Sequence, residues 1–225
     1  MKNKNVLVIV AHADDETLGC GGTIQKLKKL GYQVYVMIFT DGVSSRKKKL
    51  SKEIQNRSNQ IKKVSKLLNF KIFKHYNLPD NELDKISNLG LVKKIEAAII
   101  KINPEIILTH SNKDLNIDHQ KISNATITAC RPLPKSKIKQ LLFFEILSST
   151  EWNFNSNRIN FNPNRFYDIT DFIEKKLEAI KIYKSEIRQY PHPRSLEGIK
   201  TLSKFRGQCI GVNYAEAFEV GYIKD

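Results

Sequence analysis

Along residues 1–146, segments with the apolar pattern of a strand are followed in turn by segments with the apolar pattern of a helix. Continuous apolar runs rich in Val and Ile predict strands buried on both faces, whereas apolar residues three or four positions apart predict helices. The expected strands cover residues 6–11, 34–40, 71–75, 105–109 and 141–146, and the expected helices cover residues 23–30, 54–69, 89–102 and 119–129. This order predicts a parallel sheet with helices on both faces.

The pattern is weaker in the last third of the chain. Residues 148–166 hold many Asn and aromatic residues without a period, which predicts coil or short strands. A helix is expected from Ile173 to near Arg188, followed by a rigid turn at 190–195, a short helix at 195–205 and a closing segment at 207–220. With 225 residues and no internal repeat, we expect one α/β domain with a core at 1–146 and a C-terminal segment, 147–225, that completes the site.

The candidate chemistry starts where the first expected strand ends. His12, Asp14 and Asp15 follow the apolar run directly, and a glycine cluster at 19–22 comes next. In open α/β sheets, ligands bind at the carboxyl ends of the strands. A catalytic zinc ion takes three protein ligands, of which this stretch supplies two at most. The alternative is an Asp pair that caps the following helix.

Residues 11–16, Ala-His-Ala-Asp-Asp-Glu, resemble the signature of the LmbE-like, or PIG-L, zinc-dependent de-N-acetylases. The usual motif of that family has Pro at the position of Ala13. Its second motif, His-x-Asp-His, resembles residues 116–119, although Asn116 replaces the first histidine. The similarity runs on to residues 215–218. It implies a Rossmann-like α/β fold and a hydrolase that removes the acetyl group of an N-acetylated sugar.

The resemblance also implies roles for individual residues. It assigns one zinc ion per chain to His12, Asp15 and His119, and it makes Asp14 the general base. The carboxylate at Asp118 would support the site beside the ligands, or cap the helix that follows. A histidine that opens a helix can also simply bond the backbone, which is the alternative for His119.

Asn116 is the informative departure from the family pattern. The family histidine at this position is thought to stabilise the tetrahedral oxyanion. An Asn amide can donate a hydrogen bond there, but it cannot carry a positive charge or transfer a proton. His110 at a strand end and His192 in the Pro-His-Pro turn could compensate, and His192 is preferred as a catalytic residue because two prolines hold its ring in place. The alternatives are a strand-end hydrogen bonder at His110 and a surface residue at His192.

Four further residues are expected to bind substrate. Arg57 and Asp80 match family positions that contact the sugar, although Gln60 stands where the family often has Glu. Asp41 places another carboxylate at the end of an expected strand, and Arg194 is a candidate partner for an acidic substrate group. Taken alone, Arg57 would be an ordinary salt-bridge residue and Asp80 a turn former.

The formal net charge of +15 permits an acidic substrate, nucleic acid or an anionic surface as partner, or reflects compositional drift. We expect a sugar that carries phosphate, a nucleotide or a carboxylate, as in surface glycan or glycoconjugate synthesis. Nucleic-acid binding is disfavoured because no helix-turn-helix signal or basic motif interleaved with aromatic residues occurs.

Two other functions stay open: an amidase for another small acyl amide, such as a thiol-conjugate precursor, and a non-catalytic metal- or sugar-binding protein. No apolar run reaches the length of a membrane span, and residues 1–5 lead straight into the first strand, so a cytoplasmic protein is expected. Cys20, Cys130 and Cys209 fit a reducing compartment, with Cys20 either a ligand or a small buried side chain. The oligomeric state, a homo-oligomer included, stays open.

Overall fold

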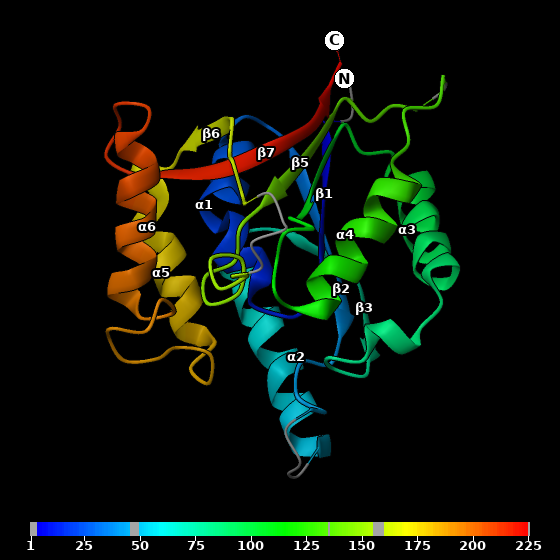
Figure 1. Cartoon of the computed structure of the whole chain (residues 1–225), viewed down its shortest axis with the longest axis horizontal. Coiled ribbons are helices and arrows are strands. Elements are labelled where there is room, and N and C mark those ends of the chain that lie inside the picture. The colour runs from blue at the N-terminus through cyan, green and yellow to red at the C-terminus, as the bar shows by residue number, and fades with distance from the viewer. Residues whose placement is uncertain (1–3, 46–49, 135, 155–159, 225) are drawn as a thin grey trace.

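A twisted sheet of seven strands forms the centre of the computed structural model, which describes residues 4–45, 50–134, 136–154 and 160–224 (Figure 1). Across the sheet the strands are β3 (Lys71–Leu78), β2 (Gln33–Thr40), β1 (Asn5–Val10), β4 (Ile106–His110), β5 (Gln140–Phe144), β7 (Ala215–Ile223) and β6 (Arg165–Asp168). The first five run parallel, whereas β7 is antiparallel to β5 and to β6. The basic run at 46–49, expected in a loop, lies outside the described residues.

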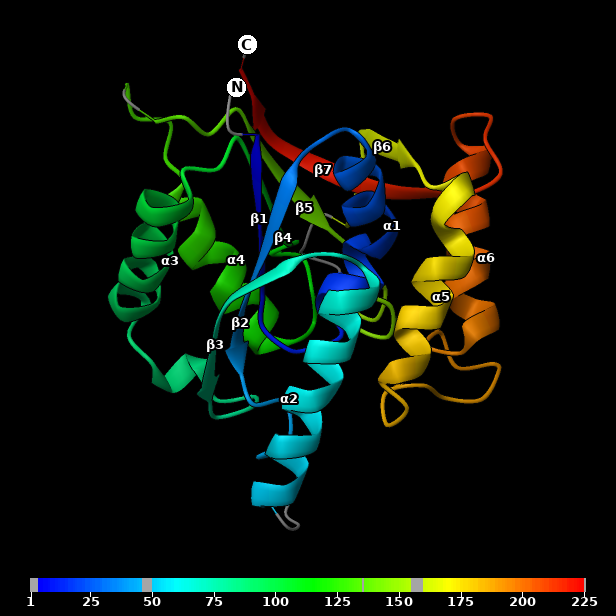
Figure 2. The same ribbon diagram turned by 180° about the vertical axis from the view of Figure 1, so that it is seen from behind.

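Helices cover both faces of this sheet, as the alternation predicts (Figures 1 and 2). One face carries α1 (Asp15–Lys29), α2 (Leu50–Leu67), α5 (Ile173–Ile182) and α6 (Leu196–Gln208), and the other carries α3 (Asn88–Ile102) and α4 (Ile117–Ala129). Strand β1 is buried throughout because its alternate side chains enter two apolar clusters, with Val8 facing α1 and Ile9 facing α3. Two short 3-10 helices, at Leu83–Lys85 and Thr170–Phe172, complete the helical elements.

Helix α1 begins at Asp15, earlier than the apolar spacing from Thr23 predicts. The glycine cluster is helical here, with a kink at Cys20, whose φ is −149°. Glycine is required because the helix packs closely on its neighbours: a Cβ at Gly22 would lie 2.7 Å from Cγ2 of Ile169. The early start brings Asp15 into the first helical turn, directly at the end of β1.

The C-terminal segment also differs from the expected elements. Helix α5 ends at Ile182 rather than near Arg188, and the chain between α5 and α6 turns back toward the carboxyl ends of the parallel strands. The closing segment contains a long strand, β7, which extends beyond the expected end at 220 and pairs with β5 on one side and with the edge strand β6 on the other. The sequence shows no clear alternation of apolar and polar residues there. The first four residues of β7 are all buried, and only the later ones are partly or fully exposed.

The strand order places a topological switch point beside β1. From β1 the chain moves to β2 and β3 on one side, and it later returns to β4 on the other side. Ligands of open α/β sheets bind at such points, outside the carboxyl ends of the strands. The residues after β1 and β4 therefore meet where a site is expected. No helix in the described part of the chain combines the length and the apolar character that a membrane crossing requires.

Candidate active site

Two imidazoles and one carboxylate converge at this switch point. His12 and Asp15 follow β1, and His119 lies in the first turn of α4. Nδ1 of His12 lies 3.1 Å from Nε2 of His119 and 3.3 Å from Oδ2 of Asp15. The same carboxylate oxygen lies 3.4 Å from Nε2 of His119. The structure thus brings together the three residues that the resemblance implies as zinc ligands.

The size and the chemistry of this triangle fit a zinc ion. Ligand atoms about 2.0–2.1 Å from a tetrahedral zinc ion lie about 3.3–3.4 Å from one another. The buried Oδ1 of Asp15 has no hydrogen-bond partner among the described residues. Although burial disfavours an imidazolium, Asp114 and Asp15 raise the pKa of His119 to about 9. The surrounding carboxylates therefore favour positive charge at this point, which a metal cation supplies.

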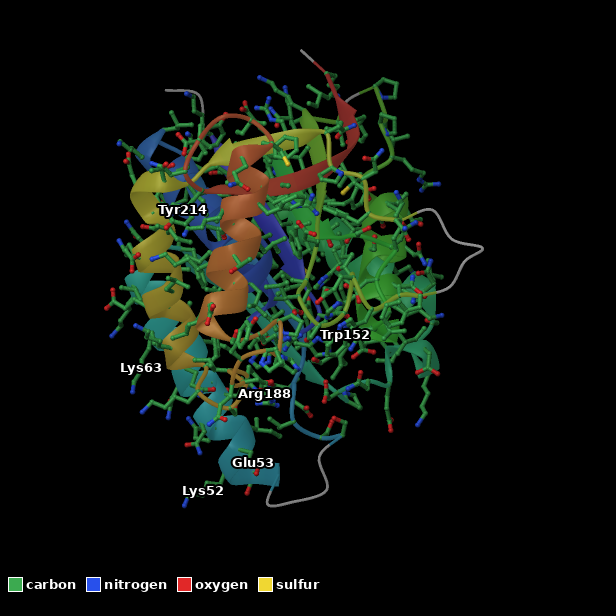
Figure 3. The ribbon with its side chains drawn as sticks, turned by 60° about the vertical axis from the view of Figure 1, so that its left-hand side comes forward. Lys52, Glu53, Lys63, Trp152, Arg188 and Tyr214 are labelled. Atoms are coloured by element: carbon green, nitrogen blue, oxygen red, sulfur yellow. The ribbon has the colours of Figure 1, made fainter. Side chains whose placement is uncertain are left out.

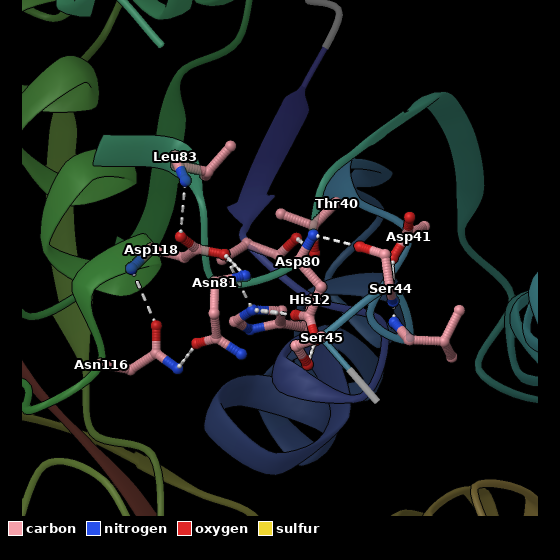
Figure 4. Close-up of polar contacts among 12 residues, drawn as sticks. His12, Thr40, Asp41, Ser44, Ser45, Asp80, Asn81, Leu83, Asn116 and Asp118 are labelled. Atoms are coloured by element: carbon pink, nitrogen blue, oxygen red, sulfur yellow. Dashed lines mark hydrogen bonds and ion pairs between the residues drawn. The ribbon is translucent and has the colours of Figure 1, made fainter. Parts of the chain in front are cut away.

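Both histidines turn their second ring nitrogen toward carboxylates. Nε2 of His12 lies 3.1 Å from Oδ1 of Asp80 and 3.2 Å from Oδ2 of Asp118 (Figure 4). Nδ1 of His119 lies 3.1 Å from Oδ1 of Asp114. A carboxylate that accepts the outer N–H of a metal-binding imidazole fixes the orientation of the ring. Asp80 and Asp118, expected to bind substrate or support the site, thus orient His12, and the three are also close enough to share a cation.

Asp118 additionally fastens the loop that follows β3. Its Oδ2 accepts the backbone N–H of Asn81 at 2.8 Å, and its Oδ1 accepts that of Leu83 at 3.0 Å (Figure 4). Asp80 of the same loop also accepts a hydrogen bond from the hydroxyl of Ser45. The loop after β3 is therefore held against the start of α4, where it forms one wall of the site.

Asp114 is a candidate that the sequence reasoning missed. Besides facing His119, its buried carboxylate accepts the hydroxyls of Ser149 and Thr150, the latter at 2.7 Å. Burial favours the neutral acid, but His119 and these hydroxyls lower the pKa of Asp114 to about 2. The available signal was chemical: a metal-binding histidine needs an outer partner, and Asp114 lies in the polar loop just before the helix that carries His119.

The triangle of His12, Asp15 and His119 lies in a pocket that Asp14 also lines. The backbone of Asp14 has a conformation that residues other than glycine rarely adopt. Its φ is 115°, and its backbone N–H donates to Oε2 of Glu16 at 3.0 Å. The buried Glu16 accepts the phenol of Tyr183 at 2.8 Å as well. Burial raises the pKa of Asp14 to about 7, although Arg194 opposes this. A carboxyl that titrates near neutrality beside the metal ligands suits a general base.

Two guanidiniums line the pocket, and both face carboxylates. Arg57 of α2 pairs with Glu186 and donates to the backbone oxygen of Ala13 at 3.2 Å. Arg194 has its NH1 3.2 Å from Oδ2 of Asp14. Glu186 belongs to the chain between α5 and α6, which the sequence did not connect with the site. The two arginines expected to bind an acidic group are thus already paired.

Asn116 lines the pocket from the N-cap of α4. Its Oδ1 accepts the backbone N–H groups of Asp118 at 2.8 Å and His119 at 3.3 Å, which caps the helix. Its Nδ2 donates one hydrogen to Oδ1 of Asn81 at 3.0 Å (Figure 4). The amide carries a second hydrogen, so a donor role toward a substrate oxygen is compatible with the cap.

The two histidines offered as replacements lie elsewhere. His110 is fully buried, stacks on His119 with 4.0 Å between ring centroids, and accepts the backbone N–H of Ala11 at 2.9 Å. Burial and His119 lower its pKa to about 3, so the ring is neutral. Neither His110 nor His192 belongs to the described residues that line the pocket; His192 packs on Trp152 instead.

Asp41 and Cys20 have local structural contacts. Oδ1 of Asp41 accepts the backbone N–H groups of Val43 and Ser44, each at 2.9 Å, and closes the turn after β2 (Figure 4). Cys20 is fully buried and donates to the backbone oxygen of Glu16 at 3.3 Å. Among the described residues, neither belongs to a group of side chains that could share a cation. Cys20 is thus a small buried side chain. Asp41 is not among the described residues that line the pocket.

Comparison with known proteins agrees with this arrangement. The model of the PIG-L family, described as GlcNAc-PI de-N-acetylase, matches residues 7–130, more than half of the chain. The chain belongs to this family. The matched region includes most of β1, all of α4 and all three members of the ligand triangle.

Individual relatives of this PIG-L family member carry deacetylase names. It is 29% identical to the uncharacterized deacetylase YaiS of Escherichia coli over 82% of this chain and 92% of that protein. It is 25% identical to the diacetylchitobiose deacetylase of Thermococcus kodakarensis, over 95% of this chain and 81% of the relative. The solved N,N'-diacetylchitobiose deacetylase of Pyrococcus horikoshii superposes with a TM-score of 0.76 at 24% identity, covering 97% of this chain and 84% of the other.

Proposed function

We propose that this protein is a zinc-dependent N-deacetylase that releases acetate from an N-acetylated sugar. The observation that supports it most directly is the triangle of His12, Asp15 and His119 beside the carboxylate of Asp14 in one pocket. The names of its relatives, which include diacetylchitobiose deacetylases, suggest the substrate class. We propose one zinc ion per chain at this triangle.

The charges of the pocket favour a neutral sugar. Arg57 faces Glu186 and Arg194 faces Asp14, so a phosphate or carboxylate would have to displace these partners. The lining of the pocket contains four carboxylates and two guanidiniums, so the net charge of +15 does not arise from the pocket. A sugar with an acidic, phosphorylated or nucleotide-linked substituent is therefore the second candidate, supported by the two guanidiniums in the lining.

The residues of the pocket can be given roles on this basis. When bound, zinc supplies Lewis-acid polarisation of a carbonyl oxygen and lowers the pKa of water. Asp14 accepts the proton of the attacking water and then delivers it to the nitrogen of the leaving amine. The second hydrogen on Nδ2 of Asn116 donates to the developing oxyanion. Asp118 and Asp114 hold the two imidazoles in place.

A deacetylation screen of the zinc-loaded protein tests this function. N-acetylglucosamine, diacetylchitobiose and a nucleotide-linked N-acetyl sugar are incubated with the enzyme, and released acetate and free amine are both quantified. We expect turnover of the neutral sugars. Asp14→Asn removes the base with little change in size and should lower the rate by about 10²–10⁴-fold with zinc still bound.

Asp171→Asn is the matched control, because it makes the same change at a carboxylate that is 69% exposed and pairs with Lys29. It should retain the wild-type rate. Near-normal turnover by Asp14→Asn would contradict the base role. Zinc binding without hydrolysis of any sugar would favour the non-catalytic metal- or sugar-binding protein. Hydrolysis of acyl amides that lack a sugar, with no turnover of the sugars, would favour the amidase.

A further inference from the structure

Trp152 is the single tryptophan of the chain, and it is partly exposed, with 36% of its surface accessible (Figure 3). It lies in the connection between β5 and β6. Its indole meets the imidazole of His192 edge to face, with 5.4 Å between ring centroids and 77° between planes. An exposed aromatic pair contributed by two separate segments marks a surface that can stack on a ligand.

Hydrogen bonds hold the segment that carries Trp152 against the loop between β4 and α4. On the Trp152 side, the hydroxyl of Thr150 donates to Oδ2 of Asp114 at 2.7 Å. The amide of Asn153 donates to the backbone oxygen of Lys113 at 2.9 Å. The segment that carries the indole is therefore fastened to the same carboxylate that faces His119.

Arg194 joins the aromatic pair to the pocket. It lines the pocket, and its Nε donates to the backbone oxygen of Leu147 at 3.1 Å, in the Trp152 segment. Its backbone N–H donates to Nδ1 of His192, also at 3.1 Å. Arg194 thus connects the wall of the pocket with both segments of the Trp152–His192 pair.

The pair offers an apolar face together with a hydrogen-bond donor. Because Nδ1 of His192 accepts from the backbone, the proton of the neutral ring is on Nε2. Burial and the charges of Arg188 and Arg194 lower the pKa of His192, which keeps the ring neutral. A pyranose has a complementary construction, with apolar C–H faces and hydroxyl groups around its edge.

We propose that Trp152 and His192 form a subsite for a second sugar ring, linked to the N-acetylated ring that occupies the pocket. The inference rests on the proposed function and narrows its substrate class to a disaccharide or a longer neutral glycan. The paired state of Arg57 and Arg194 favours this occupant over an anionic group. The indole stacks on the ring, and Nε2 of His192 donates to one of its hydroxyls.

The single tryptophan gives this proposal a direct readout. Zinc-loaded Asp14→Asn protein, which retains the ligand without turnover, is titrated with diacetylchitobiose while indole emission is recorded. The disaccharide should change the emission saturably. N-acetylglucosamine should leave the emission unchanged and should raise the apparent Kd of the disaccharide by competition in the pocket.

Kinetics with otherwise wild-type protein provide the second measurement. Trp152→Ala should raise KM for the disaccharide about tenfold, which corresponds to about 1.4 kcal/mol, while leaving KM for the monosaccharide and kcat unchanged. Trp152→Phe keeps an aromatic face and should recover most of the loss. Phe205→Ala removes an aromatic residue of α6 that is 54% exposed, and it should change neither KM.

The outcomes separate this subsite from the function on which it rests. Hydrolysis of both sugars without any change of emission, and with unchanged KM in Trp152→Ala, overturns the subsite alone. A change of emission with a nucleotide-linked sugar but not with the disaccharide overturns the choice of occupant. A wild-type protein that hydrolyses neither sugar overturns the proposed function and the subsite with it.

Discussion

At the scale of single residues, Asn116 has two tasks that the sequence did not separate. Its oxygen caps α4, while its nitrogen faces Asn81 and the pocket. Asn116→Ser keeps a good cap and removes the amide donor. If the amide stabilises the oxyanion, this change should lower kcat by about 10²–10³-fold while zinc content and stability stay near the wild type. Steady-state kinetics and metal analysis of the same preparation measure both.

Asn116→Ala is the companion variant, because it removes the donor and the cap together. It should lose activity to the same extent and should also lower the free energy of unfolding by about 1 kcal/mol. A wild-type rate in Asn116→Ser would remove Asn116 from the chemistry. The amide of Asn81, which lies against it and also lines the pocket, would then be the next donor to test.

The motif residues indicated which side chains meet at the centre of the site, but not which groups support them. The motif residues His12, Asp15 and His119 meet as the family resemblance implies. Their supporting groups could not be predicted, because those contacts join segments far apart in the chain. Asp114, for example, accepts a hydrogen bond from Thr150, and Glu186 forms an ion pair with Arg57. No local pattern encodes such pairs; they follow from the topology.

At the scale of elements, α1 depends on a buried ion pair behind the site. Glu216 of β7 accepts the backbone N–H groups of Gly22 at 2.9 Å and Thr23 at 2.6 Å, which caps the helical segment after the kink at Cys20. Lys176 of α5 lies 2.7 Å from the same carboxylate. The pair therefore joins α1, α5 and β7 underneath the loop that carries the metal ligands.

Glu216→Gln should be strongly destabilising although it changes few atoms. The amide leaves Lys176 as a buried charge without a counter-ion, and its nitrogen cannot accept from the backbone of α1. We expect a loss of about 3–5 kcal/mol in the free energy of unfolding, measured by urea denaturation. Glu174→Gln breaks an ion pair with Lys200 at a carboxylate that is 76% exposed, and it should leave the free energy of unfolding close to the wild-type value. Equal effects would show that the buried pair contributes nothing specific.

Elements with strong periodicity were predictable, and those defined by packing were not. The continuous apolar runs of β1, β2 and β4 were enough to predict that these strands are buried. The first turns of α1 contain three glycines and show no apolar periodicity, so the spacing predicted a helix only from Thr23. Their helical structure follows from the close approach of Gly22 to Ile169 and from the cap at Glu216.

At the scale of the molecule, the net charge and the charges of the pocket favour different substrates. The composition gave +15, but the pocket lining contains Asp14, Asp15, Asp80 and Glu186 against the two guanidiniums. Net charge describes the average surface, whereas recognition depends on which groups are already paired. For that reason we propose to test neutral sugars first, although the basic composition favours an acidic substrate.

The topology also makes metal binding a link between distant parts of the chain. His12 and Asp15 follow β1, and His119 begins α4 on the other side of the switch point, so an ion held by all three stabilises the folded state only. At a free zinc concentration 100 times Kd, this linkage is worth about 2.7 kcal/mol. For a chain of this size we expect Tm to rise by about 5–10 °C, measured by calorimetry with zinc against chelator.

Variants at two distances from the ion test this linkage. His119→Ala removes a ligand, and its Tm should no longer depend on zinc. Asp114→Asn leaves the ligand but weakens its support, which should raise Kd for zinc by about 10–100-fold and reduce the shift of Tm. Because Asp114 also holds Thr150, Thr150→Ala serves as the control. It removes that hydrogen bond, and the one that the hydroxyl accepts from the backbone N–H of Ile146, but it leaves the carboxylate beside His119 and should keep the full shift. A full zinc-dependent shift in His119→Ala would place the ion elsewhere, with the group formed by His12, Asp80 and Asp118 as the next candidate.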